Sequence, residues 1–212
     1  MIGDKLLFTD YHRAGAAQAL ELIRTKLADR VTMAITVSGE SGSGQSEIGH
    51  VIAETLTQEG KKCIVLAQDD YFLLPPRSNH QRRQEDISWV GLEEVRMELL
   101  DEHLAKIKAR TGEPFSKPLV YFEENRIGEE SVEPVVYDVV VAEGTYTAAL
   151  ENADVRVFID RTYRQTKNSR LDRGRDPDVA FLEQVLEIEH GIISQHKARA
   201  DVIIAPPPEE QE

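Results

Sequence analysis

The stretch that decides the fold is VTMAITVSGESGSGQSEIGH, residues 31–50. It begins with an apolar, β-branched run from Val31 to Val37 and continues through a turn rich in glycine and serine. It ends in apolar residues at helical spacing, namely Ile48, Val51, Ile52 and Leu56. Apolar β-branched runs predict strands, and apolar residues three or four apart predict helices. The predicted order is therefore strand, glycine-rich loop, helix.

The loop has the spacing of the phosphate-binding P-loop, G-x-x-x-x-G-K-[ST], with Gln45 in the lysine position. Glycines let successive backbone N–H groups point at phosphate oxygens, and the following helix adds its positive N-terminal end. Gln45 donates hydrogen bonds but carries no charge. The alternative is a turn between a strand and a helix that binds no ligand. The residues expected to bind the nucleotide are Gly39, Ser41, Gly42, Ser43, Gly44, Gln45 and Ser46, with the Ser46 hydroxyl on a magnesium ion.

Composition bounds the class of protein. The chain has 212 residues, of which 41% are hydrophobic and 30% charged, as in one globular α/β domain. Its net charge of −13 argues against binding to nucleic acid or to anionic membranes. No apolar run approaches the length of a membrane span, and the N-terminus shows no secretion-signal pattern. Cys63 is the single cysteine, which excludes intramolecular disulfides, and we expect a cytoplasmic location.

The rest of the chain alternates between strand and helix patterns. Further strands are predicted at residues 62–67, 135–142, 155–159 and 202–204. Helices are predicted at residues 12–28, 91–110 and 178–199. A short hairpin is expected within residues 118–134, and a substrate-binding loop over residues 73–89.

Three parts are expected along the chain. An N-terminal helical segment, residues 1–30, packs on the core and is assigned no chemistry. Residues 31–205 form the domain built on the P-loop, and residues 206–212 form a proline-rich, acidic tail that we expect to be disordered.

Acidic residues follow two of the predicted strands. Asp69 and Asp70 come directly after residues 62–67, and Glu143 ends the run VVYDVVVA. Ligands of open parallel sheets bind at the carboxyl ends of the strands, so these carboxylates are candidates for acid/base or metal chemistry. The alternative for the aspartate pair is a role in capping a turn.

A basic segment follows the strand at 155–159. Its members are Arg161, Arg164, Lys167, Arg170, Arg173 and Arg175. We expect a lid over residues 161–176 whose arginines close over phosphates and also replace the missing P-loop lysine. The alternative is a solvated helix face balanced by neighbouring aspartates.

Taken in order, these pieces resemble uridine kinases over residues 31–206. The matching stretches are the P-loop, QDDYF at 68–72, VVVAEGTY at 139–146, RLDRGRD at 170–176 and RADVIIAP at 199–206. The resemblance implies a three-layer P-loop NTPase fold of the nucleoside monophosphate kinase type. Such a fold has a mostly parallel sheet, helices on both faces and a basic lid.

The resemblance also implies roles for single residues. Asp69 would activate the acceptor hydroxyl and, with Ser46 and Glu143, belong to the metal site. Asp70, Tyr71, Phe72, Asp86, Arg164 and Arg170 would contact the acceptor, with Asp86 on ribose hydroxyls. Arg173 and Arg175 form the catalytic Arg-Gly-Arg element of the lid. The sequence departs from the pattern at Gln45, in a shorter lid, at Ile87-Ser88 instead of His-Pro, and at Asn125 near the usual base-reading histidine.

We therefore predict Mg²⁺-dependent phosphoryl transfer from ATP to a hydroxyl of a small molecule, a nucleoside such as uridine or cytidine. No nucleic-acid or membrane partner is expected, and homo-oligomer formation is left open. Two alternatives stand beside this prediction. One is a nucleotide-binding or regulatory protein with weakened catalysis, and the other is a kinase for pantothenate, glycerate or phosphoribulose.

Overall fold

A computed structural model describes residues 1–3, 5–167 and 179–208 of the chain. Five parallel strands form its main sheet in the order β2-β5-β1-β6-β7. The strands are β1 (Met33–Gly39), β2 (Cys63–Ala67), β5 (Val139–Glu143), β6 (Val155–Ile159) and β7 (Val202–Ile204). The predicted parallel sheet is confirmed, and each strand overlaps one of the predicted apolar runs, although β5 begins four residues later than predicted.

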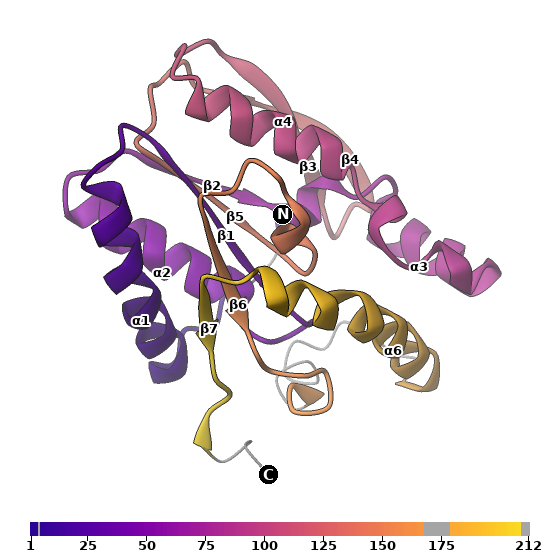
Figure 1. Ribbon diagram of the computed structural model, residues 1–212. Coiled ribbons are helices and arrows are strands. Elements are labelled where there is room, and N and C mark those ends of the chain that lie inside the picture. Colours follow the sequence, from indigo (N-terminus) through magenta and orange to yellow (C-terminus); the bar gives the residue numbers. More distant parts are fainter. Residues whose placement is uncertain (4, 168–178, 209–212) are drawn as a thin grey trace.

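Helices cover both faces of this sheet (Figure 1). The helices are α1 (Asp10–Leu27), α2 (Gln45–Gln58), α3 (Pro76–Glu85), α4 (Met97–Lys108) and α6 (Val179–His196). Side chains alternate along β1, so Met33, Ile35 and Val37 pack with α1 and α2. Ala34, between them in sequence, packs on the opposite face with α4 and with Ile193 of α6. The predicted three-layer α/β architecture is therefore confirmed.

A hairpin lies beside the main sheet. It pairs β3 (Phe115–Tyr121) with β4 (Arg126–Val132) in antiparallel register, and Asn125 turns the chain with a φ of 49°. Ile2 extends the hairpin by a parallel bridge to Tyr121. The predicted hairpin is confirmed, although it begins at Phe115, three residues before the expected range of 118–134. The first residue of the chain, Met1, lies beside Asp69, just after the carboxyl end of β2.

The prediction of a loop over residues 73–89 is wrong, because α3 occupies residues 76–85. The helix sequence PRSNHQRRQE contains no apolar stripe, so hydrophobic periodicity does not reveal it. Pro76 at the first helical position starts the helix instead. Likewise, α4 begins six residues later than predicted, since Gly91 adopts a φ of 145° and a short 3₁₀ turn precedes the helix.

Short 3₁₀ turns occupy the ends of several elements. They are η1 (Gln68–Tyr71), η2 (Ile87–Trp89), η3 (Leu92–Glu94), η4 (Thr147–Ala149) and η5 (Lys197–Arg199). Within the predicted lid, the Thr166 N–H donates to the carbonyl of Thr162, and residues 168–176 lie outside the described part of the chain. In the described ranges, no helix is long and apolar enough to cross a membrane.

Candidate active site

The loop between β1 and α2 is a tight curl of backbone. Gly42 and Gly44 adopt φ values of 77° and 106°, which side-chain-bearing residues rarely reach. Gly39 has no room for a side chain, because a Cβ there would lie 2.6 Å from Ser43 Oγ. The curl leads directly into α2, which begins at Gln45. This strand, turn and helix provide the setting in which backbone N–H groups and a helix N-terminus bind phosphate.

Gln45 braces this loop from within. Its side-chain Nε2 donates to the carbonyls of Gly39 at 2.6 Å and of Glu40 at 3.0 Å. An amide group has two hydrogens to donate, so both are engaged in the loop. The other polar atom of the side chain, Oε1, is only an acceptor and does not attract a phosphate oxygen. In this arrangement the side chain shapes the loop without offering a donor to a ligand.

Ser46 and Glu143 meet at the carboxyl end of the sheet. Glu143 is aligned with Val37 of β1 and Ala67 of β2, and Ser46 Oγ donates to its Oε2 at 2.8 Å. Burial, and then the nearby charge of Asp69, raise the pKa of Glu143 to about 8. A cation at this place would favour the ionised carboxylate. The hydroxyl and carboxylate oxygens therefore fit Mg²⁺, which prefers oxygen ligands.

In the described residues no three His, Cys, Asp or Glu side chains gather in a metal-binding cluster. Magnesium in nucleotide sites is held by one or two carboxylates together with phosphates and waters rather than by a protein cage. Ser46 and Glu143 are the residues that would hold it here, and the ion would neutralise charge on the phosphates.

Asp69 lies close to Glu143 and also lines a pocket of about 190 Å³. Asp69 follows the end of β2 by two residues, next to the tip of β5 that carries Glu143. The pocket is lined by Met1, Asp69, Phe72, Leu74, Pro76, Asn79, His80, Arg83, Val120 and Phe122. A carboxylate between a phosphate loop and a small pocket is placed to accept a proton from a hydroxyl bound in that pocket.

Arg83 on the pocket wall is engaged by two buried glutamates. Its Nε and Nη2 donate to Glu94 at 2.7 and 2.6 Å, and Nη2 also contacts Glu189 of α6 at 3.1 Å. Asn79 donates to the same Glu94 carboxylate at 2.9 Å. Burial raises the pKa of Glu189 to about 7 even beside the guanidinium. The positive charge of Arg83 is therefore matched by the protein itself.

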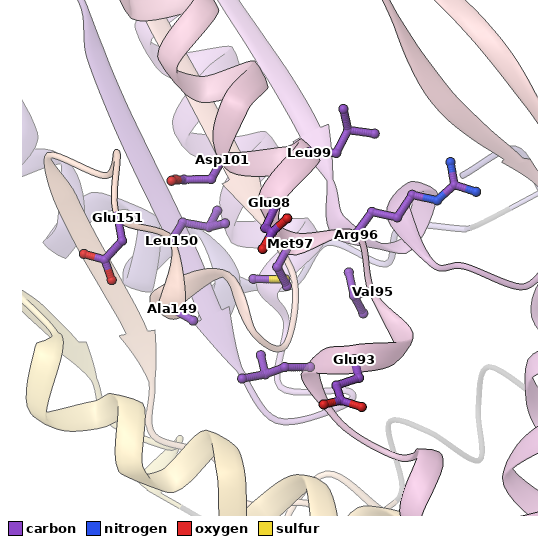
Figure 2. A pocket seen from close by; sticks show the side chains of 11 residues that line it. Glu93, Val95, Arg96, Met97, Glu98, Leu99, Asp101, Ala149, Leu150 and Glu151 are labelled. Carbon is purple, nitrogen blue, oxygen red and sulfur yellow. The ribbon is translucent and has the colours of Figure 1, made fainter.

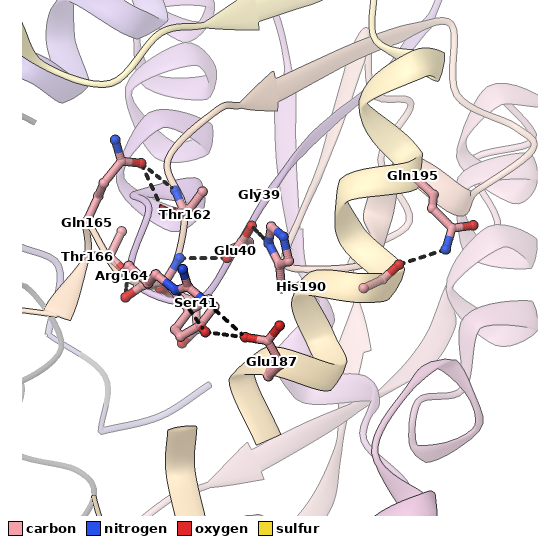
Figure 3. Close-up of polar contacts among 12 residues, drawn as sticks. Gly39, Glu40, Ser41, Thr162, Arg164, Gln165, Thr166, Glu187, His190 and Gln195 are labelled. Atoms are coloured by element: carbon pink, nitrogen blue, oxygen red, sulfur yellow. Dashed lines mark hydrogen bonds and ion pairs between the residues drawn. The ribbon is translucent and has the colours of Figure 1, made fainter. Parts of the chain in front are cut away.

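The first half of the loop is tied to α6 and to the segment after β6 (Figure 3). Glu40 is 5% exposed, and its Oε1 lies 2.7 Å from His190 Nδ1. The Tyr163 N–H donates to Glu40 Oε2 at 2.6 Å, and Thr166 Oγ1 donates to the carbonyl of Ser41 at 2.8 Å. The carboxylate inside the loop is thus held by neighbouring elements.

The model of the "Phosphoribulokinase / Uridine kinase family" matches residues 34–210. The chain belongs to this family. Membership confirms the resemblance drawn from the ordered motifs, and it makes the chain a member of a family of ATP-dependent kinases.

Individual relatives of this family member are distant. A uridine kinase from Lactobacillus helveticus (strain DPC 4571) is 25% identical over 182 residues, covering 80% of this chain and 84% of that protein. The bifunctional alpha-galactosidase/sucrose kinase AgaSK from Mediterraneibacter gnavus is 24% identical over 188 residues, covering 80% of this chain and 20% of that protein. The solved structure of a possible uridine kinase from Bacillus stearothermophilus has a TM-score of 0.60 at 21% identity, covering 91% of this chain and 98% of that one. The last likeness shows the fold.

Two residues of the QDDYF stretch turn away from the pocket. Asp70 accepts hydrogen bonds from the Val120 N–H at 2.9 Å and from Lys117 Nζ at 3.3 Å, and so anchors the hairpin. Tyr71 is completely buried, and its hydroxyl lies 2.8 Å from His103 Nδ1 in α4. Phe72 does line the pocket. The structure thus places one of these three predicted acceptor-contacting residues beside Asp69.

The other residues assigned through the resemblance lie further out. Asp86 is exposed at the end of α3, accepts hydrogen bonds from Ser88 and pairs with Arg82 at 3.3 Å. It does not line the pocket that contains Asp69. Arg164 is 77% exposed and contacts Glu187 of α6. Arg170, Arg173 and Arg175 lie outside the described residues, so their assigned roles stay predictions.

No sequence pattern indicated that Arg83, Glu94 and Glu189 would form a cluster. Asn79 and Arg83 are four residues apart and share one face of α3, so recognising the helix would have brought them together. Glu189 comes from α6, more than 100 residues later, and no local pattern links it to Arg83.

A larger pocket, about 580 Å³, lies elsewhere, between residues 92–101 and the loop at 149–151 (Figure 2). Its lining is mostly apolar with an acidic rim, and it contains neither Asp69 nor any P-loop residue. The smaller pocket beside Asp69 is therefore the candidate acceptor site.

Proposed function

We propose that this protein transfers the γ-phosphoryl group of Mg²⁺-bound ATP to a hydroxyl of an uncharged small molecule. The observation that carries this proposal is the contact of Ser46 with Glu143 at 2.8 Å, next to Asp69 and its pocket. A P-loop, a metal position and a carboxylate beside a pocket are the parts that phosphoryl transfer requires.

Each part has a role in the transfer. Backbone N–H groups of residues 42–46 hold the phosphates, and Ser46 with Glu143 holds the metal. Asp69 accepts the proton of the acceptor hydroxyl while the hydroxyl oxygen forms a bond to the γ-phosphorus. The bond between the γ-phosphorus and the oxygen that bridges it to the β-phosphorus breaks, and ADP leaves with that oxygen. Positioning and charge stabilisation supply most of the acceleration in such reactions.

The charges around the pocket favour an uncharged acceptor. Arg83 is already bound to Glu94 and Glu189, and Asp69 adds a further negative charge. An acceptor that carries a phosphate or a carboxylate would therefore be repelled by Asp69, while the charge of Arg83 is already balanced by Glu94 and Glu189. Two relatives are named for uridine and sucrose, both of them uncharged polyhydroxyl compounds. We infer a nucleoside such as uridine or cytidine as the first choice, ahead of pantothenate, glycerate or phosphoribulose.

The test is a phosphoryl-transfer assay with purified protein, Mg²⁺ and either ATP or GTP. The acceptor panel contains uridine, cytidine, sucrose and fructose on the uncharged side, and pantothenate, glycerate and ribulose 5-phosphate on the anionic side. Turnover with an uncharged acceptor is expected. Turnover with anionic acceptors alone would refute the inference about charge.

Asp69→Asn tests the assignment of the base. This variant is expected to lose about 10²- to 10⁴-fold in kcat while keeping its affinity for the triphosphate. Asp29→Asn removes the same charge at the exposed end of α1 and serves as the matched control. Full turnover by Asp69→Asn would show that another group takes the proton.

One observation favours a second candidate function, a nucleotide-binding regulatory protein. Both amide hydrogens of Gln45 are used inside the loop, so this side chain does not support the transferring phosphate. Binding of nucleotide without turnover on the whole acceptor panel would favour this second function.

A further inference from the structure

A triphosphate bound in this loop needs a nearby positive charge. The side chains placed around the loop include the carboxylates of Glu40 and Glu143, and Gln45 contributes no charge. A phosphate group is stabilised far more by a charged donor than by a neutral one. The question is which basic side chain of the described structure lies against the loop.

Arg161 lies there. β6 pairs with β1 so that Ile159 is aligned with Gly39, and Arg161 follows two residues later, alongside the loop. Its guanidinium Nη1 lies 3.5 Å from the carbonyl oxygen of Ser43. The residue is only 6% exposed, so its charge is held inside the protein beside the loop instead of extending into solvent.

Helix α1 helps to hold this guanidinium in place. The Arg161 guanidinium carbon lies 5.2 Å from the centre of the Tyr11 ring, within the range of a cation–π contact. The next residue of α1, His12, sits against Gly44, where an added Cβ would come within 2.6 Å of its Nε2. The N-terminal end of α1 therefore packs on the loop and on Arg161 together.

Two other arginines near the site contact glutamates. Arg83 is bound by Glu94 and Glu189, and Arg164 is 77% exposed beside Glu187. A guanidinium has five N–H donors on three nitrogens, enough to contact the loop and a phosphate together.

We propose that Arg161 is a phosphate-binding residue that supplies the charge which Gln45 lacks. In this proposal Gln45 shapes the loop, and Arg161 neutralises negative charge on the phosphates of the nucleotide. The inference rests on the proposed function, because it assumes that the loop binds a nucleoside triphosphate.

The test measures binding of the non-hydrolysable ATP analogue AMP-PNP with Mg²⁺ by isothermal titration calorimetry. Arg161→Gln is expected to weaken binding about 10- to 100-fold, as expected for the loss of a charge-assisted hydrogen bond. Adding Gln45→Lys to this variant is expected to restore most of the affinity, because the new ammonium brings back a positive charge at the loop. Arg24→Gln, on the exposed side of α1, is the matched control and should bind as the wild type does.

The outcomes separate the two proposals. If Arg161→Gln binds AMP-PNP as tightly as the wild type does, the role of Arg161 is overturned and the proposed function is unaffected. Weak binding that Gln45→Lys does not restore means that Arg161 only supports the loop, and it also overturns the charge assignment. A wild type that binds no AMP-PNP at millimolar concentration overturns the proposed function itself.

Circular dichroism establishes that each variant is folded. If Arg161→Gln does not fold, Arg161→Lys takes its place, because it keeps the charge. Binding by Arg161→Lys within about tenfold of wild type is expected, as a point charge is retained but the forked donors are lost. Complete loss of binding by folded Arg161→Lys would refute the inference.

Discussion

Replacing Arg83 with methionine tests whether this arginine belongs to the scaffold or is available to an acceptor. The Glu94 side chain is fully buried, and Arg83 reaches both of its oxygens, at 2.6 and 2.7 Å. Glu189, 10% exposed, is the second partner at 3.1 Å. Removing the guanidinium leaves two largely buried carboxylates without their cation.

The expected loss follows from that burial. Breaking a buried ion pair by removing one partner costs about 3–5 kcal/mol, because the remaining charge is uncompensated. The neighbouring variant Arg82→Met removes an exposed pair with Asp86 and should cost about 0–1 kcal/mol. Adding Glu94→Gln to Arg83→Met removes one orphaned charge, so the double variant should lose about 2 kcal/mol less than the sum of the single variants.

The pH dependence of Arg83→Met has a defined sign. Without the guanidinium, the pKa of Glu189 rises further above the value that it has in the unfolded chain. As pH falls through the raised pKa, the folded state takes up protons that the unfolded state does not, so the stability of the variant should increase from pH 8 toward pH 5.

Urea denaturation followed by tryptophan fluorescence measures these quantities. Trp89, the single tryptophan, donates to Asn79 Oδ1 at 2.9 Å and therefore reports on this cluster. A loss below about 1 kcal/mol for Arg83→Met, or no coupling to Glu94, would mean that the arginine is not committed to the scaffold. Its charge would then be available to an anionic acceptor, which would contradict the inference of an uncharged one.

Two further predictions concern acid stability and the loop. Burial lowers the pKa of His103 to about 4, so the folded state binds fewer protons than the unfolded state between pH 6.5 and 4. The free energy of unfolding of the wild type should therefore fall as pH decreases from 6.5 to 4, and that of His103→Gln should fall less, as measured by urea midpoints. Equal slopes of stability against pH in the two proteins would contradict the burial of a neutral histidine. Gly44→Ala combines a φ of 106° with a contact to His12, whereas Gly60→Ala has a φ of 87° and open space. Both should lose about 1–2 kcal/mol from backbone strain, but only Gly44→Ala should also lose AMP-PNP affinity, at least tenfold, in calorimetry; unchanged affinity would show that the loop tolerates the methyl group.

Local patterns were sufficient to predict the frame of the site. The apolar run from Val31 to Val37 predicted a strand, which the structure has at Met33–Gly39. Gly42 and Gly44 after it adopt conformations that few other residues reach. The run that ends on Glu143 is so strongly β-forming that a strand there followed from composition. Because parallel strands present their carboxyl ends on one side, the meeting of Ser46 with Glu143 followed from their positions along the chain.

The sequence did not indicate which way individual side chains turn. Asp69 and Asp70 are adjacent and chemically identical, yet one lines the pocket and the other anchors the hairpin through Lys117. Gln45 stands in the lysine position of a phosphate loop, yet its amide turns back to the carbonyls of Gly39 and Glu40. Which way a side chain turns depends on the partners that packing brings to it.

The sequence by itself determined the strand, loop and helix that form the candidate nucleotide site, together with the carboxylates at the strand ends, because these depend on residues close together in the chain. Only the tertiary structure decided the charge of the candidate acceptor pocket and the place of Arg161. Those depend on contacts such as Arg83 with Glu189 and Arg161 with Tyr11, which join segments far apart in sequence. Burial then fixes the strength of such contacts, since a charge excluded from water must be matched by whatever the fold places beside it.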